Sequence, residues 1–202
     1  GFSHLRDIGL ALGEFRAAGK HIYALGNSYT QAQYYLASHA DEIMLNNYGG
    51  VDLEGFSAWQ NYFGEALASL GINIHIFRVG EYKSAVEPFE RNDMSPEARD
   101  NYSQLLGELW QLYIEQVSNN RDLPQGAIDD LINNLDTHLA TVAGDSAQLA
   151  LQQRLVDRVE PQTASIAHLR EALGSSADDE LPLVSYRAYL RQRPPQTTQG
   201  RP

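Results

Sequence analysis

Two short apolar runs, separated by a stretch without Gly or Pro, constrain the fold of this chain more than any other feature. Residues 21–25 (HIYAL) end at the turn signal Gly26-Asn27, and residues 42–45 (EIML) follow after the stretch 30–39. Short apolar runs bounded by turn residues are typical of buried strands, and the stretch between them favours a helix. A strand, a helix and a second strand in this order predict an α/β fold with a mainly parallel sheet and right-handed crossovers.

Helical and strand patterns continue on both sides of this unit. Ser95-Pro96-Glu97 combines an N-cap, a first-turn proline and a first-turn acid, and predicts a helix that runs to about Asn119. Residues 123–155 favour two or three short helices, and residues 155–159 a short strand. Other apolar repeats predict a helix from Leu5 to about Gly19, a helix through Trp59, Phe63, Leu67 and Leu70 that stops at Gly71, and a strand through Ile72, Ile74 and Ile76.

The length of 202 residues, 43% of them hydrophobic, allows one sizeable core with an appendage. We therefore predict a domain over residues 1–160, a helix and connecting segment over 161–190, and a polar, Pro-containing tail over 191–202 that is disordered. Because the chain starts at Gly1 and enters a helical pattern within a few residues, we interpret it as a fragment of a longer protein.

Composition excludes several classes of function. Fifteen basic against twenty-six acidic residues give a net charge of -11 without any basic run, so nucleic acid is not an expected partner. The absence of Cys excludes disulfides, thiolate metal sites and a Cys nucleophile, and the six His residues do not form a zinc motif. Because phosphate-binding and dinucleotide-binding glycine motifs are also missing, we expect no metal and no cofactor. No apolar run approaches the 18 or so residues of a membrane span, so any membrane anchor must lie outside this chain.

Ser28 lies in a near match to a nucleophile elbow. The segment Gly26-Asn27-Ser28-Tyr29-Thr30 stands between a predicted strand and a predicted helix, but Thr30 replaces the closing glycine that lets helix and strand pack closely. We therefore favour Ser28 as the cap of the following helix, with Ser28 as a nucleophile the alternative.

Lys83 is the other candidate for chemistry. It follows the predicted strand beyond Gly80, and most of its neighbours are apolar. A lysine acts as a base only when neutral, and lowering its pKa from about 10.4 to about 7 costs about 4.6 kcal/mol. Burial among apolar groups can supply this shift. Position and composition alone, however, favour an ordinary lysine that extends from a loop into solvent.

A longer pattern around Lys83 changes this balance. Residues 77–89 (FRVGEYKSAVEPF), followed by residues 92–96 (NDMSP), closely resemble the lysine segment of the bacterial signal peptide peptidase A family, peptidase family S49, in its long, internally duplicated form. The resemblance covers residues 5 to 160, with further similarity at residues 34–43, 51–56, 107–110 and 155–157.

This resemblance implies a ClpP/crotonase-like spiral of βαβ units, of which residues 1–160 form the N-terminal domain without its first strand or strands. It also implies a cofactor-free Ser-Lys peptidase that degrades cleaved signal peptides at the bacterial inner membrane, with the catalytic domain facing the periplasm. Lys83 occupies the position of the general base.

The same resemblance places the serine nucleophile in a second, C-terminal half, where two glycines follow it. Gln31-Ala32-Gln33 occupy the equivalent place in this chain, and Gln31 cannot attack a carbonyl. The implied partners are therefore peptide substrates, the C-terminal half of the same protein and further copies in a homo-oligomer. This chain alone is expected to be inactive.

Three alternatives remain open. The domain could be a non-catalytic scaffold that assembles subunits, which predicts an exposed Lys83 that titrates freely. Crotonase-type acyl-thioester chemistry shares the fold but lacks paired carboxylates at a suitable position. If the chain is part of a peptidase, the strand over residues 77–82 could pair with an extended substrate by β-augmentation.

Overall fold

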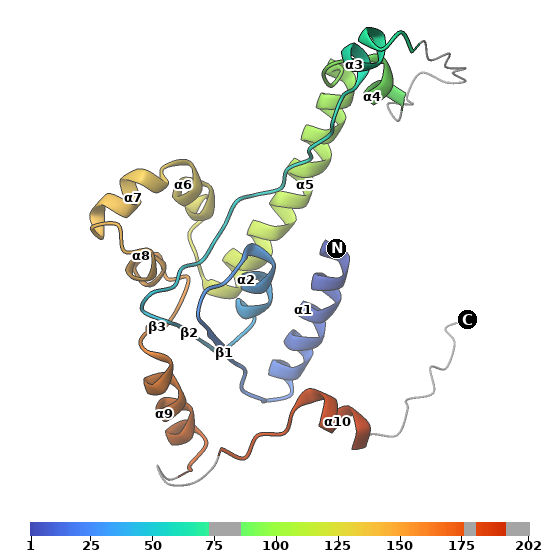
Figure 1. Ribbon diagram of the computed structural model, residues 1–202. Coiled ribbons are helices and arrows are strands. Elements are labelled where there is room, and N and C mark those ends of the chain that lie inside the picture. Colours follow the sequence, from blue (N-terminus) through green and yellow to red (C-terminus); the bar gives the residue numbers. More distant parts are fainter. Residues whose placement is uncertain (73–85, 176–180, 193–202) are drawn as a thin grey trace. The chain divides into compact units, whose positions relative to one another are not determined.

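The computed structural model describes residues 1–72, 86–175 and 181–192 of the chain (Figure 1). The chain divides into two compact units, Gly1–Glu160 and Pro161–Pro202. Within the described residues, the second unit contains the helices α9 (Gln162–Ala172) and α10 (Tyr186–Gln192), whereas all described strands belong to the first unit. Residues 193–202 of the tail that the sequence predicts lie outside the described residues.

The first unit is built on a small parallel sheet in the order β1-β2-β3 (Figure 1). Strand β1 (Tyr23–Gly26) pairs with β2 (Glu42–Leu45), and β2 pairs with β3 (Arg158–Val159). Helix α2 (Gln31–Ala37) connects β1 to β2, as parallel neighbours require a crossover. The predicted α/β class is therefore confirmed.

The helices around the sheet follow the predicted patterns closely at most positions. Helix α1 (Phe2–Ala17) precedes β1, and the long helix α5 (Pro96–Arg121) begins after Ser95, whose hydroxyl accepts a hydrogen bond from the backbone N–H of Ala98. Three short helices lie between α5 and β3, namely α6 (Ala127–Asn133), α7 (Leu135–Thr141) and α8 (Ser146–Gln152). Both the N-cap at Ser95 and the short helices between residues 123 and 155 are confirmed.

The predicted helix through Trp59 is wrong over its first half. Helix α3 covers only Gly64–Ser69, and Trp59 lies in a non-helical segment with 93% of its surface exposed. The reason is a tertiary contact that apolar spacing cannot show: the N–H groups of Phe63 and Gly64 donate to carbonyls of Pro88 and Arg91. Of the strand predicted to follow, only Ile72 lies within the described residues.

The core of the first unit joins the sheet to helices that lie far apart in the sequence. Ile43, Met44 and Leu45 of β2 are completely buried, and Tyr34 of α2 and Val117 of α5 are equally inaccessible. Three consecutive buried residues are expected in the central strand of a parallel sheet. Among the helices in the described ranges, none has the length and apolar character to cross a membrane.

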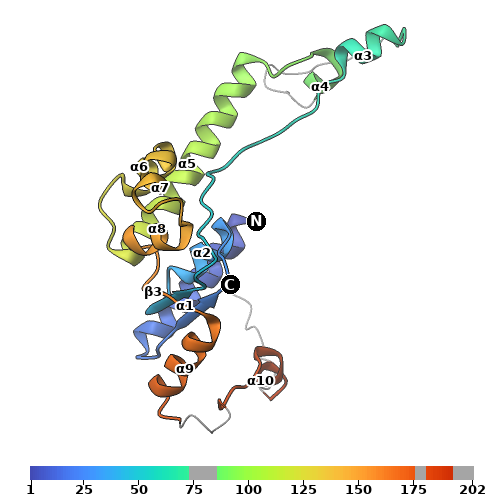
Figure 2. The same ribbon diagram turned by 60° about the vertical axis from the view of Figure 1, so that its left-hand side comes forward.

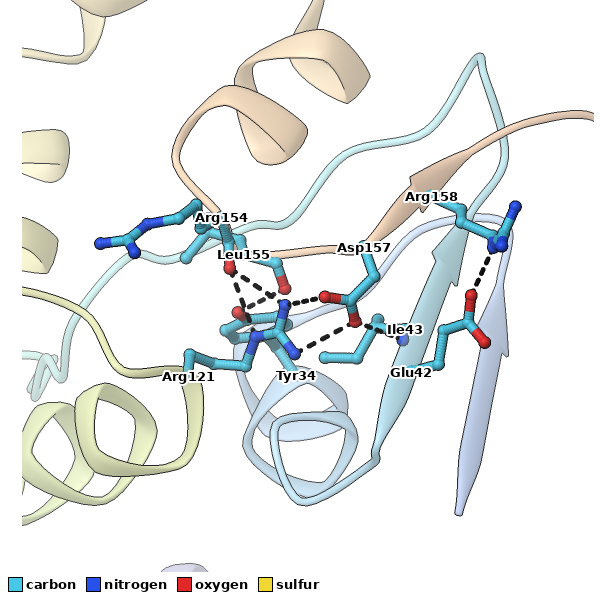
Figure 3. Close-up of polar contacts among 8 residues, drawn as sticks. All are labelled: Tyr34, Glu42, Ile43, Arg121, Arg154, Leu155, Asp157 and Arg158. Atoms are coloured by element: carbon cyan, nitrogen blue, oxygen red, sulfur yellow. Dashed lines mark hydrogen bonds and ion pairs between the residues drawn. The ribbon is translucent and has the colours of Figure 1, made fainter. Parts of the chain in front are cut away.

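A partly buried ion pair joins the end of α5 to the sheet (Figure 3). Arg121, whose side chain is only 9% exposed, binds Asp157 through two nitrogens, with Nη2–Oδ1 at 2.7 Å and Nη1–Oδ2 at 3.1 Å. Arg121 also donates to the carbonyl of Arg154, and Asp157 accepts the N–H of Ile43 at 2.7 Å. These contacts hold α5, β2 and the segment before β3 together.

Helix α1 is positioned by close contact with His39, which follows α2. A Cβ added to Gly9 would lie 2.7 Å from Nε2 of His39, so only glycine fits there without displacement. This nitrogen is buried and has no hydrogen-bond partner within the described residues. Burial, with a smaller effect from Arg16, lowers the pKa of His39 below its usual value.

We predict that Asp157→Ala destabilises the protein by about 3 kcal/mol, because it leaves the buried guanidinium of Arg121 without its carboxylate. Urea unfolding followed by circular dichroism measures this change. Asp93→Ala is the matched control, since its pair with Arg91 is largely exposed and should contribute less than about 1 kcal/mol. Equal losses in the two variants would contradict the structural role of Asp157.

We also predict that His39 makes stability depend on pH. Because the pKa is lower in the folded state, the unfolded state takes up the proton first as the pH falls below about 6.5. The free energy of unfolding should therefore decrease between pH 7.5 and 5.5, and protonation would also add charge beside Arg6, Glu14 and Arg16, which line the same cavity. Urea unfolding of His39→Gln should show a smaller decrease over this range, and an unchanged decrease would contradict the prediction.

Candidate functional site

Lys83, the predicted general base, lies outside the described residues, as do residues 77–82, the strand that could pair with an extended substrate. The structure does describe the chain on both sides of this segment. The side before it is α3, and the side after it is α4 (Glu87–Glu90). Helices α3 and α4 therefore flank the predicted site, and we call these two helices and the contacts between them its frame.

Helices α3 and α4 are joined through the backbone. The N–H of Phe63 donates to the carbonyl of Pro88 at 2.6 Å, and the N–H of Gly64 donates to the carbonyl of Arg91 at 3.1 Å. The N–H of Glu65 donates to Oδ1 of Asn92 at 2.7 Å. Donors at the start of α3 are thus satisfied by the chain around α4, and Figure 2 shows the two helices together near the start of α5.

Gly64 is required for this approach. A Cβ at this position would lie 2.8 Å from the carbonyl oxygen of Arg91 and 2.9 Å from that of Glu90, both of them backbone atoms that cannot move aside easily. The two stretches of chain that flank residues 73–85 are therefore held at close range.

A buried carboxylate fixes the same frame to α5. Glu87 is 9% exposed, and it accepts hydrogen bonds from the hydroxyl of Ser95 at 2.6 Å and from its N–H at 3.2 Å. The Ser95 hydroxyl also accepts the N–H of Ala98. A negative charge at the start of a helix is favourable, because the first turn has unpaired N–H groups and the positive end of the helix dipole.

Gln31 is the first residue of α2, and its side chain is fully engaged with the backbone. Oε1 accepts the N–H groups of Glu54 at 2.9 Å and Gly55 at 2.8 Å, while Nε2 donates to the carbonyl of Gly55 at 3.0 Å. The Gln31 carbonyl accepts the hydroxyl of Tyr113 at 2.9 Å. The residue therefore joins α2, the segment at residue 55 and α5, a role that the sequence did not reveal.

Ser28 does not cap α2, so this prediction was wrong. Thr30 is the N-cap, and it forms a reciprocal capping box with Gln33. Ser28 is exposed and is separated from the helix by Tyr29, which is buried and donates its hydroxyl to the carbonyl of Met44. In a nucleophile elbow, the Ser lies on a sharp turn that leads directly from a strand into a helix. Ser28 does not lie on such a turn.

Two further observations limit the chemistry of the described part. No group of three or more His, Asp or Glu side chains in these ranges could hold a metal ion. Burial raises the pKa of the Tyr29, Tyr34 and Tyr113 hydroxyls above the usual value, so these groups remain protonated donors around neutral pH.

Comparison with known proteins gives consistent matches over most of the chain. Residues 14–175 match peptidase family S49. The chain is 42% identical to Protease 4 of Salmonella typhi over 198 residues, which are 96% of this chain and 31% of that protein. It is 43% identical to Protease 4 of Haemophilus influenzae over 190 residues, and 25% identical to the chloroplastic serine protease SPPA of Arabidopsis thaliana over 189 residues. The chain thus spans about 27 to 31% of the length of these relatives.

We predict that Ser95→Ala lowers the free energy of unfolding by about 2 kcal/mol. The change removes the cap of α5 and also takes one donor from the buried carboxylate of Glu87. Ser103→Ala, at an exposed position of the same helix, is the matched control and should change stability by less than about 0.5 kcal/mol. Urea unfolding measures both changes, and a small effect at Ser95 would contradict the proposed frame.

Proposed function

The chain belongs to peptidase family S49, and we propose that it supplies the general base, Lys83, to a serine peptidase with a Ser-Lys dyad. The observation that carries this proposal is the combination of the family match with the segment around Lys83, whose two flanks are joined by α3, α4 and the Glu87–Ser95 contact. A general base must be held in one geometry relative to the nucleophile.

The nucleophile in this proposal comes from a C-terminal half of the same protein. Gln31, at the position expected for a nucleophile, has its side chain engaged in three hydrogen bonds to backbone and carries no nucleophilic atom. The chain corresponds to the N-terminal part of relatives named Protease 4 and covers about 30% of their length. Enough sequence therefore remains in such proteins for a second half.

The chemistry requires no cofactor. The neutral Nζ of Lys83 takes the proton of the serine hydroxyl as its oxygen attacks the carbonyl carbon of the substrate. The resulting ammonium then gives this proton to the leaving amine, and a water molecule hydrolyses the acyl-enzyme by the same route. Closing of the second half over Lys83 removes water from the amine and lowers its pKa.

Several finer statements belong to the same proposal. The small parallel sheet is compatible with a ClpP/crotonase-like spiral of βαβ units. The substrates are cleaved signal peptides, and the enzyme acts at the bacterial inner membrane with its catalytic domain in the periplasm. Copies of the protein assemble into a homo-oligomer that shelters the site.

A scaffold role is the second candidate, because several large apolar side chains are exposed. Trp59 and Leu70, on either side of α3, are 93% and 73% exposed, and Leu105 of α5 is 52% exposed. Such residues suit an interface with another chain. The two candidates differ at Lys83, which a scaffold does not need.

We predict that Lys83→Met in the full-length protein lowers kcat for peptide hydrolysis by at least about 10³-fold, because the Met side chain cannot accept the serine proton. The variant should fold normally, as checked by circular dichroism and gel filtration. The matched control is Lys20→Met, which changes an exposed lysine after α1 and should leave kcat unchanged.

Retained turnover in Lys83→Met would contradict the proposed function and favour the scaffold. A second variant tests the alternative nucleophile: Ser28→Ala should keep full turnover, because Ser28 is an exposed loop residue. Loss of turnover in Ser28→Ala would instead assign the nucleophile to this chain.

A further inference from the structure

Residues 50–54 pair along one edge with the chain at Tyr29 and Gln31. Tyr29 forms a parallel bridge with Val51, in which the N–H of Tyr29 donates to the carbonyl of Gly50 at 2.9 Å and the N–H of Asp52 donates to the carbonyl of Tyr29 at 2.8 Å. In such pairing, the main-chain groups of alternate residues face the partner. The main-chain groups of residues 50, 52 and 54 therefore face the chain at Tyr29 and Gln31.

Gln31 continues this pairing with its side chain. The backbone enters helix α2 at Gln31, so it can no longer follow the segment. Its Oε1 accepts the N–H of Glu54, which is the bond that a main-chain carbonyl would accept at the next rung of a parallel ladder. The side chain thus continues the pairing of the segment from Asp52 to Glu54, before the chain turns at Gly55, whose φ is 79°.

The opposite edge of the segment has no hydrogen-bonded partner among the described residues. In the part of the chain that the structure describes, the N–H and C=O groups of Val51 and Leu53 make no hydrogen bond. These are the groups that alternate pairing directs away from Tyr29. An extended edge with free main-chain groups is the arrangement that accepts another strand by β-augmentation.

An apolar cavity of about 240 Å³ runs along this segment. It is lined by all five residues from 50 to 54, so it extends along the length of the segment. Its opposite wall comes from α6, α7, α8 and the residues around them, and its large aliphatic members are Leu131, Ile132, Leu135, Leu139, Leu149 and Leu155. Such a wall suits a large apolar side chain.

The charged side chains that line this cavity are all acidic. Asp52 and Glu54 are the charged residues among those that line it, and both are exposed. Two carboxylates beside an apolar cavity favour a ligand that carries Lys or Arg next to its apolar side chain.

We propose that the edge of residues 51–53 is a peptide-binding site for an extended segment with a large apolar side chain next to Lys or Arg. The apolar side chain enters the cavity, the backbone pairs with Val51 and Leu53, and the basic side chain lies beside Asp52 and Glu54. The proposal rests on the proposed function only in taking a peptide as ligand, because the site uses neither Lys83 nor a nucleophile.

The test measures binding of fluorescent peptides to full-length Lys83→Met protein by anisotropy at low ionic strength. One peptide places Leu between two Lys residues, and a second of equal length places Leu between two Glu residues. We expect the Lys peptide to bind about tenfold more tightly. The double variant Asp52→Asn/Glu54→Gln should reduce this difference to less than about threefold, while Glu108→Gln/Glu115→Gln, with the same change in charge at exposed positions of α5, should preserve it.

Two further changes test the cavity and the edge. Leu135→Glu places a carboxylate in the cavity at a side chain that is already 46% exposed, so the fold should persist while affinity for both peptides falls. Methylation of backbone nitrogens on the edge of the Lys peptide that pairs with the protein should also weaken binding, because the methyl groups block strand pairing.

Unchanged affinity after both changes would overturn the proposed site. A complete lack of peptide binding would also overturn it, and would mean that another segment of the protein covers this edge. The anisotropy is measured immediately after mixing, and the peptide is then checked for cleavage by mass spectrometry. Cleavage by Lys83→Met contradicts the proposed function alone, so the two failures can be distinguished.

Discussion

The partly buried pair of Arg121 and Asp157 is a contact on which the first unit depends. Arg121 ends α5, Asp157 directly precedes β3, and the same carboxylate binds the N–H of Ile43 in β2. Since Arg121 is almost completely buried, its charge requires this partner, and the partner is available only when residues 43, 121 and 157 come together. Formation of the short sheet therefore depends on the packing of α5, a helix from the middle of the chain, against it.

Tyrosine hydroxyls then position α2 within this frame. Tyr34 donates to the carbonyl of Leu155 at 2.7 Å, and Tyr113 donates to the carbonyl of Gln31 at 2.9 Å. Because burial raises the pKa of both hydroxyls, they remain donors over the range in which the protein is expected to work. Helix α2 is short, and these two bonds hold its body and its first residue to segments distant in sequence.

The sequence predicted those elements whose signals are local and missed those that depend on distant contacts. Strand β2 and the start of α5 at Ser95 follow from an apolar run and a capping pattern, and both are where the sequence places them. Thr30 as the cap of α2 could also have been found, since Thr30 and Gln33 have the spacing of a capping box. The start of α3 at Gly64 could not, because its donors bind a segment more than twenty residues away.

Gln31 shows why one position cannot serve both structure and nucleophilic chemistry. A primary amide donates and accepts at the same time, so Gln31 satisfies both main-chain groups of Gly55 and also the N–H of Glu54. A serine hydroxyl is shorter and has a single proton, so it cannot span these three groups, and a hydroxyl tied to the backbone is not free to attack a carbonyl. With Gln31 in place, the pairing that starts at Val51 continues to Glu54, and within the described residues the main-chain groups of Val51 and Leu53 make no hydrogen bond. Gln31, which brings no nucleophile to this position, therefore also orders the segment that carries the proposed peptide-binding edge.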